Sequence, residues 1–533
     1  MKKRKVIASL LMAALTLGSL AGCAKPTTPK TTESSMGSSE SKTDNAQKDN
    51  EPVEISIALW DIGDSLANAE NDKLYKTISE KTGVKIKPVN VTWDDADQKI
   101  QLWATNGQLP DVFAGGFVTS SFFHKWIEQG VIQPLPEDLS PYPNLQNYLK
   151  MDRAVAAMQN GRYYMIPRRT YGDITYSSQD RSLLYRWDLA KAAGVTKEPE
   201  TYDEFRDMIK KIIAADPEKK NIGGLTQVTA HLLHGLILPY GNIIEKKWVV
   251  EDGKFKPGYF AGDMKAAMQL ARDMYEEGTI EKDIALAKFD TSKEKFLQGQ
   301  SAAILVAGGG PSWLYKEIGK DYEKLYGRKF SDDIKVAPIF PCADGKKHYF
   351  IDTEAWSESY ISSKVDEKKM AAICRLYDFL SSEEGKYLSF CGFEGEDYDI
   401  KDGKVVLKEG ISLKDKYPYI KGASYICMWD PSSWDMSFPS DTPDEYRQWN
   451  VERHKQAVEE GSLPKYYDNV LFLSTPLKDS FVINAKDDLY QVMLGSEPVD
   501  KMVDDIMATY ETKGLSKMID EVNKKAEEVG IKQ

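Results

Sequence analysis

The segment that decides the fold begins with VEISIALW, residues 53–60, and continues with LYKTISEKTGVKIKPV, residues 74–89. The first stretch alternates apolar and polar residues and then becomes continuously apolar, which is typical of a strand entering a sheet. Residues 74–83 have helical periodicity and end at a glycine, whereas residues 84–89 alternate again. The segment therefore predicts a strand, a helix and a second strand in direct succession.

The same succession continues along the chain. Residues 96–105 have helical spacing and stop at an Asn-Gly pair, and residues 109–113 predict a third strand that two glycines close. Two strand–helix steps in so short a stretch indicate an α/β fold in which helices cover the faces of a sheet.

Upstream of this segment, the first residues resemble an export signal. Four of the first five residues are basic, and an uncharged, mainly apolar run over residues 6–20 leads into Leu20-Ala21-Gly22-Cys23. This layout predicts a secretory signal peptide over residues 1–22, too short to span a bilayer. The small residues before the cysteine resemble a bacterial lipobox, which implies a lipid anchor on Cys23 at the extracellular face of the cell membrane. The alternatives are an uncleaved anchor helix or a coincidental cysteine.

Composition limits what the rest of the chain can be. Residues 23–52 begin with the cysteine and are otherwise rich in Ser, Thr, Lys and acids, so we expect a flexible linker. The remainder is too long for one hydrophobic core and suits two large lobes. The net charge of −12, with no basic stripe, argues against nucleic acid as a partner and is compatible with a neutral ligand.

Four further cysteines, Cys342, Cys374, Cys391 and Cys427, contain no Cys-x-x-Cys pair. In an exported protein they could form two disulfides in any of three connectivities. Free buried thiols are the alternative that we favour, because so large a core does not depend on covalent links. The spacing does not fit a metal site, and we expect neither a metal ion nor another cofactor.

Eight segments in order resemble the maltose-binding-like extracellular solute-binding proteins of carbohydrate ABC transporters, particularly the oligosaccharide-type lipoproteins of Gram-positive bacteria. The segments are ISEKTGVKIKPV (78–89), ATNGQLPDVFAGG (104–116), FHKWIEQGVIQPLPEDL (123–139), NGRYYMIPRR (160–169), LLYRWDLAKAAGVTKEPETYDEF (183–205), FLQGQSAAILVAGGGPSW (296–313), DDIKVAPIFP (332–341) and MAAICRLYDFLSSEEGKYLSFCGFEGEDYDI (370–400). The resemblance implies a periplasmic-binding-protein-like type II fold, with two discontinuous α/β lobes joined by hinge crossovers around a ligand cleft. We place lobe 1 at 53–167 plus 345–415 and lobe 2 at 168–344 plus 416–533.

The resemblance also implies a function and partners. The protein would be a monomeric receptor that captures a carbohydrate, most simply an oligosaccharide, and delivers it to the permease subunits of an ABC importer. It would carry out no catalysis. A peptide receptor of the same architecture and a cell-surface glycoside hydrolase remain as alternatives, since pairs of acids occur throughout a chain with 82 of them.

A sugar site needs aromatic faces for the C–H side of each ring and polar groups for its hydroxyls. We therefore expect ligand-binding residues where aromatic and acidic residues meet at the ends of strands. These residues are Trp60, Asp61, Asp64, Asp111, Gly116, Phe117, Arg168, Tyr171, Trp313, Trp356, Trp429 and Trp434. Each tryptophan could instead pack in the core, and Asp111 could instead be a structural cap. Trp93, Trp103, Trp126, Trp187 and Trp248 are assigned to packing or surface.

Overall fold

The computed structural model describes residues 51–92, 95–170, 181–216, 220–229, 232–307, 315–350, 355–427, 435–440, 442–460 and 464–533. The chain divides into two compact units, 1–50 and 51–533, and the description below concerns the second unit alone. The predicted signal peptide, Cys23 and nearly all of the linker lie outside the described residues.

A five-stranded sheet is built in the order β2-β1-β3-β11-β4. Its strands are β1 (Val53–Trp60), β2 (Val84–Val91), β3 (Val112–Gly115), β4 (Ile166–Arg169) and β11 (Ala355–Ile361). The first three strands are parallel, whereas β11 runs antiparallel to both β3 and β4. The fully apolar burial of β3 and of the end of β1 explains their continuous apolar runs.

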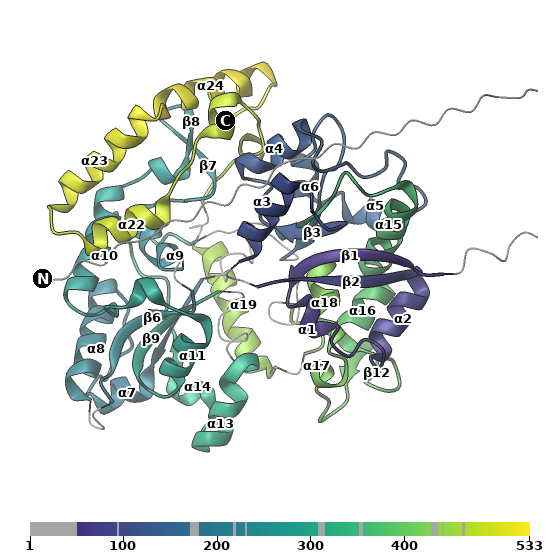
Figure 1. The fold of residues 1–533 in the computed structure, drawn as a ribbon. Coiled ribbons are helices and arrows are strands. Elements are labelled where there is room, and N and C mark those ends of the chain that lie inside the picture. The colour runs from purple at the N-terminus through teal and green to yellow at the C-terminus, as the bar shows by residue number, and fades with distance from the viewer. Residues whose placement is uncertain are drawn as a thin grey trace, which may run out of the picture. The chain divides into compact units, whose positions relative to one another are not determined.

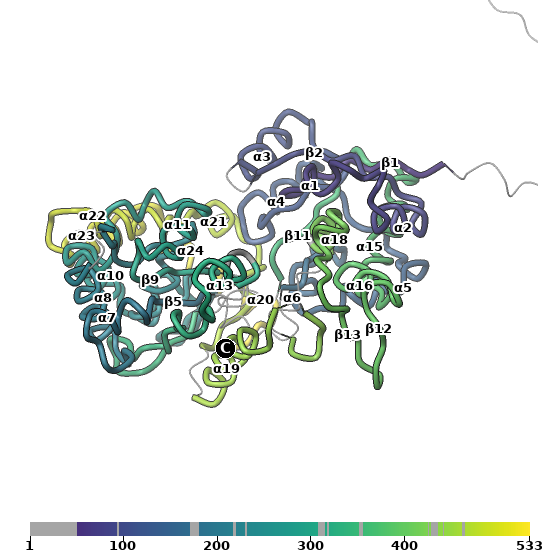
Figure 2. The backbone as a smooth tube through the Cα atoms, turned by 90° about the horizontal axis from the view of Figure 1, so that it is seen from below, coloured from purple at the N-terminus to yellow at the C-terminus, as the bar shows by residue number. Residues whose placement is uncertain are grey.

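Helices far apart in the sequence pack around this sheet and with it form what we call the first-sheet group (Figures 1 and 2). They are α1 (Ile62–Ser65), α2 (Lys73–Thr82), α3 (Ala96–Asn106), α4 (Ser121–Glu128), α5 (Pro143–Tyr148), α6 (Asp152–Ala156), α15 (Glu367–Ser381), α16 (Glu383–Cys391), α17 (Leu413–Lys416) and α18 (Tyr419–Cys427). Helices α2 and α3 end at Gly83 and Gly107, whose positive φ angles of 65° and 64° suit glycine. The predicted strand, helix and strand of residues 53–89 are thus confirmed.

A four-stranded sheet in the order β10-β5-β9-β6 forms the centre of the second-sheet group. Its strands are β5 (Ser182–Arg186), β6 (Gly223–Gln227), β9 (Ser301–Val306) and β10 (Ile334–Val336). Only β6 and β9 are parallel. The associated helices are α7 (Trp187–Ala192), α8 (Tyr202–Ala215), α9 (His234–Ile237), α10 (Met264–Glu276), α11 (Phe289–Leu297), α13 (Lys320–Tyr326) and α14 (Phe330–Asp333).

The start of α8 illustrates how local sequence sets an element. The side chain of Thr201 accepts a hydrogen bond from the backbone N–H of Glu204 at 3.1 Å, which satisfies one of the free donors at the helix start. Glu204 in turn accepts from the backbone N–H of Glu200 at 2.7 Å. This pair resembles a capping box in which Glu204 accepts from the residue before the N-cap instead of from the N-cap itself.

The C-terminal helices complete the second-sheet group. Helices α22 (Ala485–Leu494) and α23 (Val499–Thr512) pack on α10, and α24 (Leu515–Glu528) packs on the hairpin β7 (Trp248–Glu251) and β8 (Lys254–Pro257) (Figure 1). The other C-terminal helices are α19 (Asp444–Glu459), α20 (Asp468–Leu471) and α21 (Pro476–Ser480). A second hairpin, β12 (Tyr398–Lys401) and β13 (Lys404–Leu407), follows α16.

Two expected boundaries differ from the structure: β4 of the first sheet continues past the 167/168 boundary, and the boundary at 415/416 falls before α18. We placed residues 416–533 together in lobe 2, but α18 packs against β1, β4, α2 and α15 of the first-sheet group. The reason is its apolar face, because Tyr419, Ile426 and Cys427 are buried there. Residues 416–427 therefore belong with the first sheet.

The cores of both groups are apolar, and the four cysteines of the body are buried free thiols, as we favoured. Burial raises the pKa of the Cys427 thiol to about 12 and that of Cys342 to about 11, so neither is ionised at neutral pH. Among the described residues, no helix is both long and apolar enough to cross a membrane.

Candidate functional site

Two predicted site tryptophans meet at the edge of the five-stranded sheet. Trp60 is the last residue of β1, and Trp356 lies near the start of β11. Their rings stack with centroids 5.1 Å apart and planes inclined by 24°. Trp60 is 4% exposed, whereas Trp356 is only half-buried. Trp60 therefore supports the ring of Trp356, which keeps part of its surface accessible.

Arg168 holds the same tryptophan from the neighbouring strand β4. Its guanidinium carbon lies 5.0 Å from the centroid of the Trp356 ring, and its Nε donates to the Trp356 carbonyl oxygen at 3.1 Å. Thr170 donates its hydroxyl to the same oxygen at 3.2 Å. A cation beside an indole is attracted by the ring electrons. Because Arg168 is itself 1% exposed, the ring is held by fixed partners.

Gly116 leaves room beside this ring. A methyl group at its Cα would lie 3.5 Å from the Trp356 Nε1, so any larger side chain would reach the indole. Gly116 is exposed, directly after β3. The next residue, Phe117, turns inward and packs edge-on against Trp126 with centroids 5.0 Å apart. Phe117 thus lies in the core, away from the accessible face of Trp356.

The three predicted acids occupy different surroundings. Asp61 follows Trp60 with a left-handed φ of 59°, and its carboxylate pairs with Lys421 at 2.7 Å. Asp64 is exposed on α1. Asp111 precedes β3 at the end of the strand opposite to Gly116, so it does not join the group around Trp356.

Asp111 already has a complete set of protein partners. Its carboxylate accepts from the backbone N–H and hydroxyl of Ser56 and pairs with Lys369 at 2.7 Å. Burial acts to raise the pKa of Asp111, but the hydrogen bonds from Lys369 and Ser56 outweigh it, so the pKa lies below its usual value. The structure places Asp111 as a link between β1, β3 and α15.

A buried ion pair lies on the same strand as Trp356. Glu358 accepts from Arg153 at 3.2 Å and from the Tyr360 hydroxyl at 3.1 Å, and both partners of the pair are almost fully buried. Burial raises the pKa of Glu358, and the charge of Arg153 opposes part of that rise. The group stabilises β11 in the two residues beyond Trp356.

With this geometry established, comparison with known proteins identifies the family. A family model for bacterial extracellular solute-binding proteins matches residues 64–387. The chain belongs to this family. The match includes Asp64, Gly116, Arg168 and Trp356 but begins after Trp60.

Two relatives of this solute-binding protein come from Bacillus subtilis. Lipoprotein LipO is 22% identical over 340 residues, which make up 62% of this chain and 64% of LipO. The polygalacturonan/rhamnogalacturonan-binding protein YtcQ is 21% identical over 361 residues, 64% of this chain and 67% of YtcQ. The matched part thus spans less than two thirds of LipO.

Solved structures extend the likeness over most of the chain. The alginate-binding protein AlgQ2 has a TM-score of 0.66 at 18% identity, covering 90% of this chain and 98% of AlgQ2. The substrate-binding protein FusA of S. pneumoniae, in complex with kestose, has a TM-score of 0.67 at 16% identity, covering 90% and 99%. The mixed α/β fold is therefore that of type II periplasmic-binding-protein-like solute-binding proteins.

Several predicted site residues of this solute-binding protein lie outside the described residues: Tyr171, Trp313, Trp429 and Trp434. In the second-sheet group, His234 is buried and its Nδ1 lies 2.6 Å from Glu245. Burial acts to raise the pKa of Glu245, but His234 outweighs it and the pKa is lowered. Among the assigned packing residues, Trp126 and Trp248 are in the core, whereas Trp93 lies outside the described residues.

Two cavities among the described residues are lined by segments outside the first-sheet group. One has a volume of about 390 Å³ and lies at Gly223 and Glu281, and the other has about 670 Å³ and lies near Asn242 and Glu460. Neither is lined by a predicted ligand-binding residue. Within the described part of the chain, no group of three or more His, Cys, Asp or Glu residues could hold a metal ion.

Sequence reasoning missed three residues of the group around Trp356. Thr170 comes directly after β4, which contains Arg168 and Arg169, so its proximity to Arg168 was available as a signal. Lys421 and Arg153 carry no comparable signal, because their partners Asp61 and Glu358 are distant in sequence. Only the packing of α18 and α6 against the first sheet brings these pairs together.

Proposed function

We propose that this protein is an extracellular receptor that binds a carbohydrate, most simply an oligosaccharide, without altering it. The observation that carries the proposal is the half-buried ring of Trp356, supported by Trp60 and held by Arg168, in a member of the solute-binding family. Support also comes from the similar proteins, since YtcQ and AlgQ2 are named for the polysaccharides they bind and the FusA structure is a complex with kestose.

The chemistry of the group suits a sugar ring. The apolar C–H face of a pyranose or furanose can lie on the accessible face of Trp356, as aromatic rings do with apolar partners. Asp61 and Asp64 supply acceptors for hydroxyl groups near the end of β1. Because Gly116 has no side chain, the ligand can approach the indole edge closely. A hydroxyl that lost water without finding such partners would cost about 1–3 kcal/mol.

The remaining roles follow from the same proposal. The predicted lobes would close on a ligand that contacts both of them, because such a ligand binds the closed form more tightly than the open form. Tyr171, Trp313, Trp429 and Trp434 remain proposed ligand contacts. We further propose cleavage after residue 22, lipid attachment at Cys23, a monomeric state and delivery of the ligand to the permease of an ABC importer.

A thermal-shift screen of the purified full chain tests the proposal. The panel contains neutral and acidic oligosaccharides, short peptides and divalent cations. A ligand of the native state raises the unfolding midpoint as ln(1 + [L]/Kd) increases. We expect a shift with at least one oligosaccharide and recovery of that oligosaccharide uncut by chromatography. Shifts confined to peptides would favour a peptide receptor, and cleaved products would indicate a hydrolase.

A further inference from the structure

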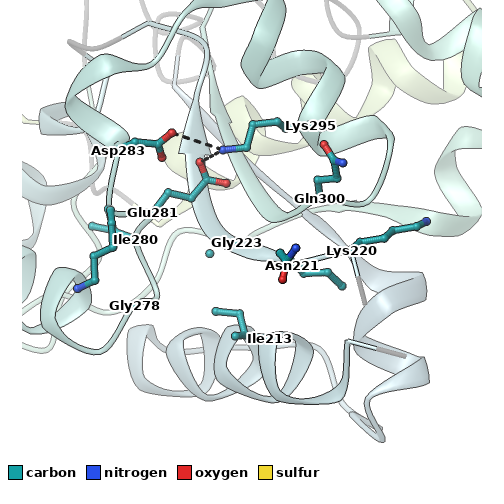
Figure 3. A pocket seen from close by; sticks show the side chains of 13 residues that line it. Ile213, Lys220, Asn221, Gly223, Gly278, Ile280, Glu281, Asp283, Lys295 and Gln300 are labelled. Carbon is teal, nitrogen blue, oxygen red and sulfur yellow. Dashed lines mark hydrogen bonds and ion pairs between the residues drawn. The ribbon is translucent and has the colours of Figure 1, made fainter. Parts of the chain in front are cut away.

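The second-sheet group contains a pocket that the proposed carbohydrate site does not use. Its volume is about 390 Å³, within the size range of small-molecule sites. It lies at the starts of the parallel strands β6 and β9, where Gly223 and Gln300 face the last turns of α8 at Ile213 (Figure 3). All of its lining residues come from positions 213–300, so it is separate from Trp356.

Backbone pairing builds one wall of this pocket. The backbone N–H of Leu225 donates to Thr279 at 2.8 Å, and the N–H of Glu281 donates to Leu225 at 3.1 Å. The segment 279–281 therefore runs along β6 like a short extra strand. This arrangement fixes the backbone of Glu281 and directs its side chain along Gly223 (Figure 3).

Gly223 is what makes space for the carboxylate. A methyl group on its Cα would lie 2.6 Å from the Oε1 of Glu281, closer than any real contact of this kind. The φ of Gly223 does not require glycine, so its small size is the relevant property here.

Only one of the two carboxylate oxygens of Glu281 has a hydrogen-bond partner among the described residues. The side chain is 4% exposed, and its Oε2 accepts from the Lys295 ammonium at 2.5 Å. Its Oε1 is buried and has no hydrogen-bond partner among the described residues. A buried acceptor without a donor is unfavourable by about 1–3 kcal/mol, more when it is charged. The pocket therefore presents a fixed acceptor that requires a donor.

The charged side chains that line the pocket limit the kinds of ligand that could supply this donor. Three lysines line the pocket, and each has an acceptor: Lys295 has Glu281, Lys282 has the Tyr275 carbonyl, and Lys220 has the Gln298 carbonyl. Three ammonium groups against two carboxylates disfavour a cationic ligand, and an anion would bring negative charge against the unpaired Oε1 of Glu281, which needs a donor. A neutral hydroxyl group avoids both costs.

We propose that this pocket is a second binding site, for a neutral polyhydroxylated molecule about the size of one sugar ring. One hydroxyl donates to the Oε1 of Glu281 and accepts from Lys295, whose ammonium has a further donor. The half-buried side chain of Ile213 contacts the C–H face of the ring. The site acts independently of the ligand held at Trp356.

A fluorophore placed at the rim of the pocket tests this site directly. Gln300 is exposed, so the variant Gln300→Cys, made in a full chain with Cys23→Ser, can be labelled with an environment-sensitive dye, because the other four cysteines are buried. The probes are methyl glucoside and myo-inositol as neutral polyols, glucosamine as a cation, glucuronate as an anion, and calcium chloride. We expect a saturable response to a neutral polyol at millimolar concentration.

Variants of the labelled chain assign the response to the pocket. In Glu281→Gln, the amide oxygen must face Lys295, so an NH₂ donor replaces the Oε1 acceptor and the apparent Kd should rise at least tenfold. In Ile213→Phe, the larger ring fills the pocket without touching the carboxylate and should also abolish the response. The matched control Glu294→Gln removes an exposed acid of α11, the helix that carries Lys295, outside the pocket and should change nothing.

The responses of these variants distinguish binding in this pocket from binding at Trp356. A polyol response that survives in Trp356→Ala and is lost in both pocket variants supports the second site. Equal responses in the parent and in folded Glu281→Gln and Ile213→Phe chains overturn it, as does the absence of any polyol response. A response only to glucosamine, glucuronate or calcium overturns the proposed ligand class, and loss in Trp356→Ala assigns the response to the other site.

Discussion

Two groups of aromatic side chains lie on the five-stranded sheet and behave differently. In the core group, Phe113, Phe117, Trp126 and Tyr360 contact one another and are at most 4% exposed. In the second group, Trp60 is equally buried, but its partner Trp356 is only half-buried and is held by Arg168.

The two aromatic groups differ in the residues that surround their rings. The rings of the core group pack mainly on one another and are buried, so their contribution is to stability. Polar contacts from Arg168 and Thr170 fix Trp356 through its backbone, and part of the indole remains uncovered. Residue type alone therefore does not distinguish a core tryptophan from one that can bind a ligand, whereas exposure with rigid support does.

The largest expected effect comes from the core group. Trp126→Ala should lower the free energy of unfolding by about 3–5 kcal/mol, because it leaves a cavity among Phe113, Phe117 and Tyr360. Guanidinium denaturation of the variant and the parent measures this loss. Folded Trp126→Ala protein should bind its oligosaccharide with unchanged affinity. If folded Trp126→Ala protein bound the oligosaccharide more weakly than the parent, the core group would also contribute to binding, and the distinction between the two groups would be wrong.

Asp111 was predicted as a ligand group, but its contacts resemble those of the core. Lys369→Met should cost about 1.5–3 kcal/mol at neutral pH, the contribution of hydrogen bonds to a charged group. The pKa of Asp111 is lowered in the folded state, so this stability is present above the unfolded value of about 3.9 and is lost as the pH falls through the folded pKa.

Denaturation measured at several acidic pH values tests whether this stabilisation is lost as the pH falls. The stability difference between the parent and Lys369→Met should shrink as the pH falls below about 4. A difference that stays constant with pH would mean that Lys369 acts through packing of its aliphatic stem and not through the charge of Asp111.

In the second aromatic group, a substitution should affect ligand binding more than stability. Trp356→Ala should weaken oligosaccharide binding by about 1–3 kcal/mol, since it removes the exposed face on which the ring rests. Isothermal titration calorimetry with the oligosaccharide from the thermal-shift screen gives this value. Its loss of stability should be smaller than that of Trp126→Ala, because the Trp356 ring is only half-buried whereas Trp126 is 4% exposed. Unchanged affinity would reject Trp356 as a ligand contact.

The smallest effect is expected at the surface. Lys421→Ala breaks the ion pair with Asp61, in which Lys421 is 52% exposed, and should change the free energy of unfolding by less than about 1 kcal/mol. Thermal denaturation at low and high salt measures it. A loss well beyond this value would show that Asp61 is fixed structurally and is not available to a ligand.

Local periodicity was enough to predict many elements of the fold. Residues 53–60, 74–83 and 84–89 form β1, α2 and β2 within one or two residues, since alternation, helical spacing and a terminal glycine are local signals. The side-chain cap at Thr201 was predictable for the same reason.

Contacts between distant segments were not predictable in this way. Nothing in the sequence near Trp60 indicates that β11 places Trp356 on it, or that Lys369 reaches Asp111. These contacts depend on the insertion of β11 between β3 and β4 and on the packing of α15. For this reason the sequence could name Trp60, Arg168 and Trp356 as candidates but could not indicate that their side chains would be neighbours.

A crystal structure of the protein with the oligosaccharide found in the screen would test the central proposal most directly. The account predicts an intact saccharide with one ring in van der Waals contact with the accessible face of Trp356 and with hydroxyls at Asp61 or Asp64. A saccharide bound with no ring near Trp356, or a cleaved product in the site, would contradict it.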